Sequence, residues 1–134
     1  MIKEAYVSFE VAKLLKEKGF DVSCHQKYDD EGYLSFNDVG YVNSEKPCDD
    51  FYALAPTQQM AMAWLREKNI SIEPSALNAH LWAYTIYKLF NKNVKELHND
   101  GVYESYEEAV EAALKYYLEN LFDYGSTRED LCSC

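Results

Sequence analysis

Residues 80–90 read HLWAYTIYKLF, and this stretch decides the fold of the chain. Aromatic and β-branched residues dominate it, and these residue types favour a strand over a helix. Because neighbouring strand residues point to opposite faces, the side chains divide into two sets. One face carries Trp82, Tyr84 and Ile86, and the other carries Leu81, Ala83, Thr85, Tyr87 and Leu89. Both sets are mainly apolar, which predicts a central strand of a sheet.

Shorter strand patterns flank this stretch on both sides. Residues 70–72 alternate as a short strand, and we expect Pro74 to end it because proline cannot donate to a ladder. Residues 94–97 are expected to add a further short strand after a turn at residues 91–93. The centre of the chain therefore predicts three sequential strands.

The N-terminal third predicts a hairpin. Residues 20–28 and 33–36 are strand candidates, and the acidic sequence DDEG at residues 29–32 is typical of the turn between them. Periodicity then fails over residues 37–50, where glycine, proline and asparagine are scattered. We expect a long loop there.

Three stretches show the apolar spacing of amphipathic helices, namely residues 9–18, 56–68 and 106–122. Ser8 is placed to cap the first helix, and Gly19 to adopt the left-handed conformation after it. Ser105 and Glu108 form a capping box at the start of the last helix. These end signals make the first and last helices well defined.

Two helix-to-strand corners share one design, at residues 14–22 and 64–72. Each has a basic last helical turn, then Gly19 or Asn69, and then alternating apolar residues. We interpret the match as convergence on one kind of corner, and a duplication is the alternative.

Together these elements predict an α+β fold, an antiparallel sheet of about four to five strands with three helices packed on it. A chain of 134 residues fits one domain. We expect this domain to cover residues 1–125, with one candidate internal boundary in the loop 37–50. Residues 126–134 are expected to form a flexible tail.

The charge balance favours a protein partner over nucleic acid. The chain carries 23 acidic and 13 basic residues, for a net charge of −10. Such a surface repels phosphate backbones, so we expect no direct nucleic-acid binding. Twelve tyrosines supply rings with a polar tip, which suit contact surfaces with an unidentified protein partner.

Targeting signals and cysteines predict a cytoplasmic protein. No run approaches the roughly 20 apolar residues that a membrane helix needs. The first residues lack the apolar region of a signal peptide, so we expect a cytoplasmic location and no membrane partner. The four cysteines are therefore expected to be free and dispensable thiols: Cys24, Cys48, Cys132 and Cys134.

No motif assigns a catalytic, cofactor-binding or metal-binding residue. Cys24 and His25 are adjacent in a predicted strand, so they point to opposite faces and do not meet at one ion. A metal site would need further ligands brought in by folding, from Cys48, His80, His98 or the tail cysteines. The carboxylates of residues 29–32 lack the alternating ligands of a calcium loop. A phosphate loop, a nucleophile elbow and a zinc-protease motif are all missing from the sequence.

Three stretches resemble one group of proteins: residues 9–20, residues 55–67, and residues 106–114 with the sequence YEEAVEAAL. The chain is similar there to small proteins of gut Bacteroidales genomes and their phages or mobile elements. The resemblance implies an intracellular, phage-related accessory protein. It assigns no cofactor, substrate or site residue.

The function predicted from the sequence is a non-catalytic protein-interaction or regulatory accessory domain. One alternative is an acidic inhibitor or DNA mimic acting on a nucleic-acid enzyme, because the outer side of the last helix is acidic. Another alternative is an enzyme of unknown type. The aromatic run from Trp82 to Phe90 resembles a base-stacking surface, but it has few basic neighbours, and core packing explains it better.

Overall fold

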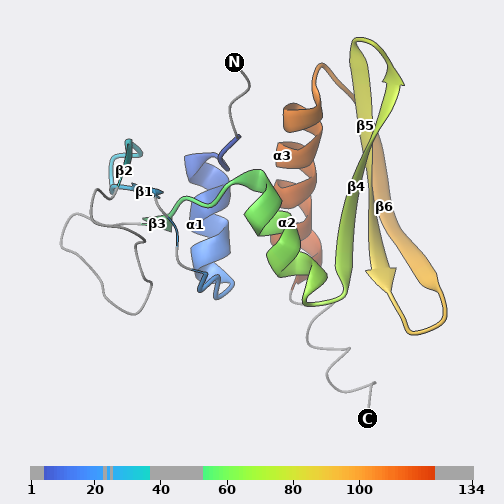
Figure 1. The fold of residues 1–134 in the computed structure, drawn as a ribbon, viewed down its shortest axis with the longest axis horizontal. Helices are drawn as coiled ribbons and strands as arrows, with labels where there is room; N and C mark the ends of the chain where they lie inside the picture. Colours follow the sequence, from blue (N-terminus) through green and yellow to red (C-terminus); the bar gives the residue numbers. More distant parts are fainter. Residues whose placement is uncertain (1–4, 23, 25, 37–52, 123–134) are drawn as a thin grey trace. The chain divides into compact units, whose positions relative to one another are not determined.

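The computed structural model describes residues 5–22, 24, 26–36 and 53–122. These ranges form three helices and two three-stranded antiparallel sheets, which confirms the α+β class (Figure 1). The chain divides into two compact units, Met1–Trp64 and Leu65–Cys134. The division falls within helix α2 (Gln58–Arg66).

Helix α1 (Phe9–Glu17) of the first unit begins and ends where the sequence predicts. The Ser8 hydroxyl accepts a hydrogen bond from the Val11 amide at 3.1 Å, which satisfies one of the free amides of the first turn. Gly19 follows the helix with φ +91°, in the left-handed region. The helix buries Val11, Ala12 and Leu15.

The predicted hairpin is confirmed as strands β1 (Gln26–Tyr28) and β2 (Leu34–Phe36), which pair antiparallel. Their turn is held by Asp29, whose Oδ1 accepts from the amides of Glu31 and Tyr33 at 2.9 and 3.0 Å. The first strand is shorter than the predicted 20–28. Residues 23 and 25 lie outside the described ranges, as does the predicted loop 37–50.

The prediction of one sheet with about four to five strands is wrong. Strand β3 (Ala53–Leu54) pairs with the other edge of β1, giving a small sheet of order β2-β1-β3. Two residues carry no periodic signal, so the sequence pattern did not reveal this strand. With both edges of β1 occupied, the hairpin forms a sheet separate from that of the second unit.

The second unit holds a larger sheet of order β4-β5-β6, in which β5 (Leu81–Leu89) is central as predicted. Strand β4 (Ile70–Asn78) runs through Pro74, so the expected stop there is wrong. Because β4 is an edge strand of this sheet, a residue without an N–H is tolerated in it.

Strand β6 (Val94–Tyr103) is much longer than the predicted 94–97. Its second half contains the sequence NDG at residues 99–101, which has low strand propensity. Gly101 lies opposite Ala83, and a Cβ at Gly101 would lie only 2.8 Å from the Ala83 Cβ. The glycine therefore allows β5 and β6 to approach closely. The same residue lowers the strand propensity of this segment, so the sequence pattern did not predict it as a strand.

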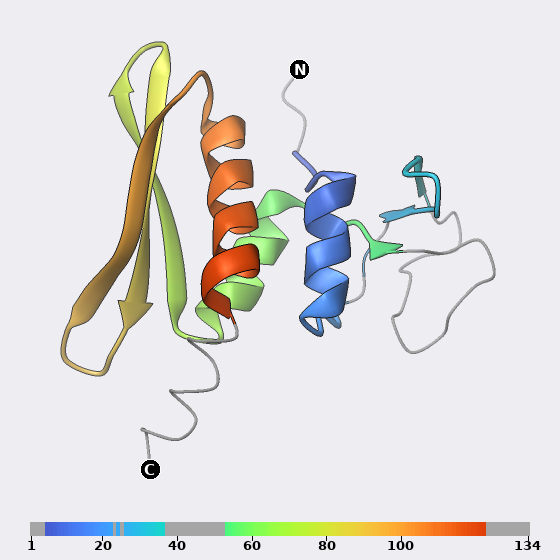
Figure 2. The ribbon, with the colours of Figure 1, turned by 180° about the vertical axis from the view of Figure 1, so that it is seen from behind.

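Helix α3 (Tyr106–Tyr116) covers one face of this sheet and contacts all three strands (Figure 2). The Ser105 hydroxyl accepts from the Glu108 amide at 3.1 Å, as predicted. The helix continues as a π turn, η1 (Tyr117–Leu121), which extends it to the predicted end. The core of this unit contains Ile70, Ile72, Tyr84, Ile86, Ala109, Val110, Ala113, Leu114, Tyr117 and Leu118.

The two corners noted in the sequence share a left-handed residue, Gly19 with φ +91° and Asn69 with φ +67°. Asparagine tolerates this conformation better than most residues. The corners differ after that residue, since Ile70 begins a strand and Phe20 does not. The shared part is thus the helix end alone.

Two glycines with the same backbone conformation provide a test of packing in the first unit. Gly19 and Gly32 both have φ +91°, but a Cβ at Gly19 would meet nothing within 4 Å, whereas one at Gly32 would lie 2.9 Å from Phe9 Cδ2. We expect Gly19→Ala to cost about 1–2 kcal/mol, the penalty of the left-handed conformation. Gly32→Ala should cost a further 1–3 kcal/mol or so from the clash.

The Phe9 ring cannot yield freely, because it packs against Tyr28 with ring centroids 5.4 Å apart. Urea unfolding of both variants measures the two losses of stability. Equal losses would show that the Phe9 ring moves aside and that the turn is not packed against α1.

Candidate functional site

Ionisable side chains cluster on the side of the larger sheet that α3 covers. We call this group the tyrosine cluster; its members are Tyr84, His98, Asp100, Tyr103 and Tyr116. Tyr84 is 2% exposed at its centre, and its ring centroid lies 5.8 Å from that of Tyr103 and 5.9 Å from that of His98. The Tyr103 hydroxyl donates to Asp100 Oδ2 at 2.7 Å. The His98 ring stacks on Tyr116 at 3.8 Å and so joins β6 to α3.

The environment of the cluster suits packing better than catalysis. Burial raises the pKa of Tyr84 above its ordinary 10.0, and the nearby Asp100 carboxylate raises it further. Burial also raises the pKa of Tyr103, as does its hydrogen bond to Asp100. Both hydroxyls therefore stay protonated at neutral pH, and that of Tyr103 donates its hydrogen bond to Asp100. A tyrosine that serves as a general base needs the opposite shift.

The raised pKa of Tyr84 makes stability depend on alkaline pH. In the unfolded chain this tyrosine loses its proton near pH 10, whereas the folded state retains it to higher pH. Unfolding then releases a proton, so stability present below pH 10 is lost as the pH rises. We expect the urea midpoint to fall between pH 9 and 11 in the wild type, and to fall less in Tyr84→Phe. Tyr33→Phe is the control, because its ring is 68% exposed; identical pH profiles for both variants would contradict the assignment.

The other side of the same sheet carries a second arrangement, which we call the open face. Its members are Ser71, Glu73 and Ser75 of β4, Ala83, Thr85 and Tyr87 of β5, and Glu96, Asn99 and Gly101 of β6. Among the described elements of this unit, none lies over this face (Figures 1 and 2). The three β5 side chains are half-buried, and most of the β4 and β6 members are exposed.

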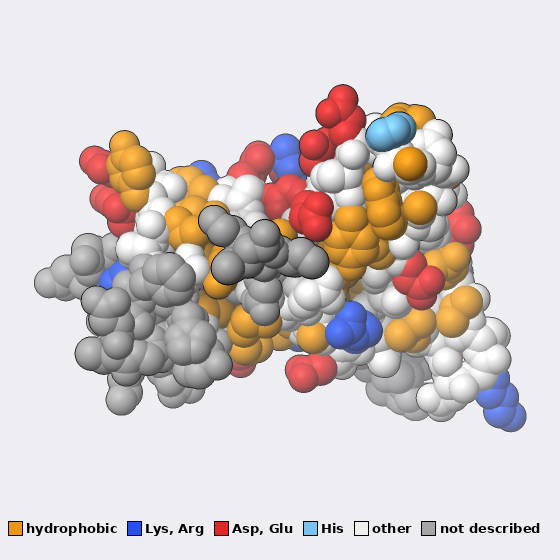
Figure 3. Space-filling view, turned by 45° about the horizontal axis from the view of Figure 1, so that its top comes forward, with side chains coloured by type: hydrophobic (Ala, Val, Ile, Leu, Met, Phe, Trp, Pro, Cys, Tyr) orange, Lys and Arg blue, Asp and Glu red, His pale blue; other side chains and the backbone are white. Residues whose placement is uncertain are grey.

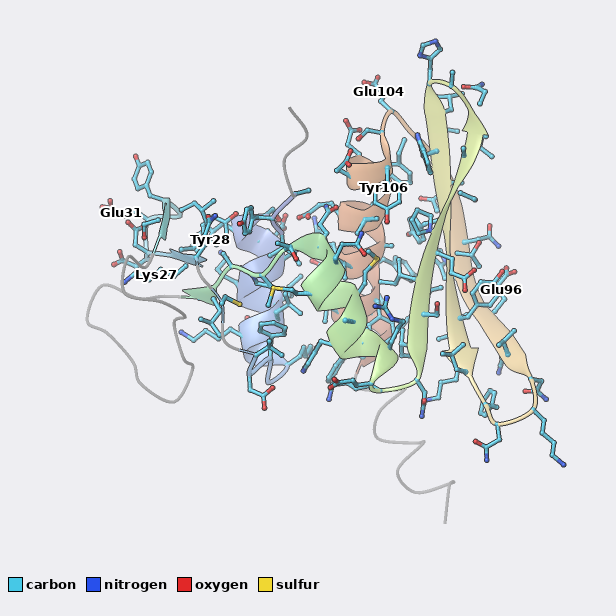
Figure 4. The ribbon with its side chains drawn as sticks, in the orientation of Figure 1. Lys27, Tyr28, Glu31, Glu96, Glu104 and Tyr106 are labelled. Atoms are coloured by element: carbon cyan, nitrogen blue, oxygen red, sulfur yellow. The ribbon has the colours of Figure 1, made fainter. Side chains whose placement is uncertain are left out.

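Cross-strand register arranges the open face in rows. Tyr87 lies between Ser71 and Glu96, and the next row places Thr85 between Glu73 and Asn99. The Ser71 hydroxyl donates to Glu73 Oε2 at 3.1 Å, and the Asn99 side-chain amide donates to Glu96 Oε2. Figure 4 shows Glu96 directed away from α3. A neighbouring side chain therefore orients each carboxylate, Glu96 in the row of Tyr87 and Glu73 in the row of Thr85.

The edges of this sheet are poor sites for adding a strand. Pro74 removes a backbone donor from β4. Strand β6 shifts register twice against β5, once between Trp82 and Ala83 and once between Ile86 and Tyr87. Such bulges bend and twist an edge, which disfavours pairing with another chain. A partner of this sheet is better accommodated on the face than along an edge.

The candidate ligands from the sequence do not come together. Cys24 is a buried free thiol, and burial raises its pKa to about 12. His80 is exposed at the turn between β4 and β5, and His98 belongs to the tyrosine cluster. In the ranges that the structure describes, no group of three or more His, Cys, Asp or Glu is placed to hold a metal ion. His25, Cys48, Cys132 and Cys134 lie outside those ranges.

The aromatic run of β5 divides between the two sides of the sheet. Trp82 makes an edge contact with Tyr106 of α3 at 5.4 Å, and Tyr84 is buried beside it. Tyr87 lies on the open face, and Phe90 is 44% exposed beyond the strand end. The run therefore does not form one continuous stacking surface.

Acidic side chains are spread over the visible surface, where basic ones are few (Figure 3). On α3 and its π turn the exposed acids include Glu107, Glu108 and Glu119. Two of them occupy the first turn, where carboxylates favour the positive end of the helix dipole. Their position thus has a structural explanation in addition to any role in binding.

Comparison with known proteins finds no match to a family model, a curated protein or a solved structure. None of the helices in the described part of the chain has the length and apolar character needed to cross a membrane. The geometry of the chain itself is therefore the basis for inferring function.

Sequence reasoning missed both arrangements. The prediction that Trp82, Tyr84 and Ile86 share one face is confirmed. The β6 residues of both arrangements beyond residue 97 were not predicted, because that strand was predicted too short. The segment from His98 to Tyr103 shows no alternation of polar and apolar residues, and Asn99, Asp100 and Gly101 all have low strand propensity, so no local signal extends the strand.

Proposed function

We propose that the chain is a non-catalytic protein-interaction domain whose partner docks on the open face. The observation that carries this proposal is that Ala83, Thr85 and Tyr87 of β5 are half-buried on a sheet face that no described element of the unit covers. Leu77 adds apolar surface at the rim, since it is 56% exposed and its Cδ1 lies near Gly101. Aromatic and apolar side chains at the centre with polar side chains around them are typical of a protein interface.

The tyrosine cluster supports the non-catalytic part of the proposal. The Tyr84 and Tyr103 hydroxyls stay protonated, and His98 is stacked on Tyr116 at 3.8 Å. These contacts hold α3 against β5 and β6, so removing them affects stability first. These packing contacts account for the residues of the cluster without a role in binding a substrate.

A substitution at the centre of the open face tests the proposal. Thr85→Arg places a long charged side chain between β4 and β6, and we expect it to reduce capture of the partner from extracts of the native host at least ~10-fold, or about 1.4 kcal/mol. Mass spectrometry of the captured proteins gives the measurement. Glu119→Arg makes a larger charge change on the π turn after α3, and we expect it to capture the same partner as the wild type.

Circular dichroism melts establish that both variants are folded before their captured proteins are compared. If Thr85→Arg captures the same proteins in the same amounts as the wild type, the open face is not the docking surface.

An acidic inhibitor of a nucleic-acid enzyme is the alternative proposal, and an enzyme of unknown type is a more distant one. The inhibitor would use the exposed carboxylates of α3 and its π turn rather than the open face. Loss of the partner in Glu119→Arg with retention in Thr85→Arg would favour it. Release of product from a screened substrate, abolished by Tyr103→Phe, would favour an enzyme.

Direct binding of nucleic acid is expected to be weak under either binding proposal. The net charge is −10, and none of the open-face residues is Lys or Arg. Titration of labelled single- and double-stranded oligonucleotides at two salt concentrations should show affinity weaker than the ~10⁻⁴–10⁻⁶ M of non-specific binders. Micromolar binding that weakens with salt would contradict this expectation.

A further inference from the structure

We propose that the open face binds a cationic segment of its partner protein, with a Lys or Arg side chain over the Tyr87 ring between Glu73 and Glu96. This inference rests on the proposed function, because it names the chemistry of the partner for the same face. Charge complementarity between that face and its ligand favours this occupant.

The electrostatics of the open face have one sign. Glu73 and Glu96 are the acidic side chains among its members, and none of its members is Lys or Arg. Lys88 and Lys95 lie opposite each other on the other side of the sheet, the side of α3. The positive charges of the sheet and the negative charges of the open face are thus separated by the backbone ladder. A cationic partner gains attraction here, and it approaches faster because the whole chain is acidic.

The spacing of the two carboxylates sets the shape of the ligand. Glu73 belongs to β4 and Glu96 to β6, with β5 between them. Two strand separations, and an offset of two residues along β5 between Thr85 and Tyr87, place the backbone of these residues about 12 Å apart. In an extended segment the side chains at positions i and i+4 share one face and lie about 13 Å apart, so two basic side chains at these positions reach both carboxylates.

Tyr87 supplies the centre of the proposed site. Its row lies directly beside Glu96 and Ser71, and its side chain is half-buried. A guanidinium or ammonium group over a tyrosine ring gains a cation–π interaction in addition to its ion pairs. Beyond the row of Thr85, the row of Ser75, Ala83 and Gly101 has small side chains, which leaves room for the backbone of an extended segment.

A second copy of the chain is a poor occupant of the same face. It would bring the same two carboxylates against those already there, and each copy carries a net charge of −10. Phosphate-bearing ligands are disfavoured for the same reason. A basic protein segment satisfies both carboxylates and the ring together.

Labelled hexa-arginine is the probe, because it presents basic side chains without other chemistry. We expect the double variant Glu73→Gln/Glu96→Gln to bind it about five-fold or more weakly than the wild type at low salt. Glu104→Gln/Glu119→Gln removes the same amount of charge from two exposed positions, Glu104 just before α3 (Figure 4) and Glu119 in its π turn, and should bind within about two-fold of the wild type. Tyr87→Leu keeps the apolar area and should weaken binding by a smaller factor, about two- to five-fold.

Equal losses in the two double variants would overturn the inference, because attraction to the acidic surface as a whole then explains the binding. Failure of the wild type to bind hexa-arginine, or equal binding of hexa-glutamate, would overturn it as well. If size-exclusion chromatography shows that the wild type is a dimer and that Thr85→Arg is a monomer, a second copy of the chain occupies the open face and the inference is wrong. If Thr85→Arg loses its host partner while the double variants remain alike, the proposed function stands without the cationic ligand.

Discussion

One helix covering one face of a three-stranded sheet is the constraint on which the second unit depends. Leu114 and Leu118 of α3 and its π turn are buried on the inner side of that helix, and β5 contributes Tyr84 and Ile86 from the strand side. Because the sheet has a single described covering helix in its unit, its two faces must differ in chemistry. The covered face is aromatic and aliphatic. The open face combines small, hydroxyl and carboxylate side chains around one tyrosine.

The same aromatic richness produces two different outcomes on the two sides of β5. On the covered side, burial and the Asp100 carboxylate raise the pKa of both Tyr84 and Tyr103 and keep their hydroxyls neutral, so polar groups are accommodated in a packed layer. On the open side, Tyr87 lies between Ser71 and Glu96, and its side chain is half-buried. Residue type alone does not distinguish these roles. The strand neighbours that β4 and β6 supply decide between them.

Sequence patterns predicted the elements with strong local signals and missed those set by pairing. The caps at Ser8 and Ser105, the left-handed Gly19 and the central strand follow from local chemistry, and the structure confirms them. The two-residue strand β3 and the second half of β6 exist because a neighbouring strand is there to pair with. The predicted end of the strand at Pro74 was wrong for the same reason, because a proline is accepted within β4 only since β4 is an edge strand. The open face could not be predicted, because it needs the register of all three strands.

The order of elements along the chain has a consequence for how the protein folds. In the second unit β4, β5, β6 and α3 follow one another, and each strand pairs with its successor, so contacts close short loops. In the first unit β1 pairs with β3, and more than twenty residues separate them, so a longer loop must close first. Loop closure costs conformational entropy before its contacts form, and chains with local contacts fold faster. The sheet that carries the open face is therefore expected to assemble early, during or soon after its own synthesis, and independently of the slower pairing in the N-terminal half.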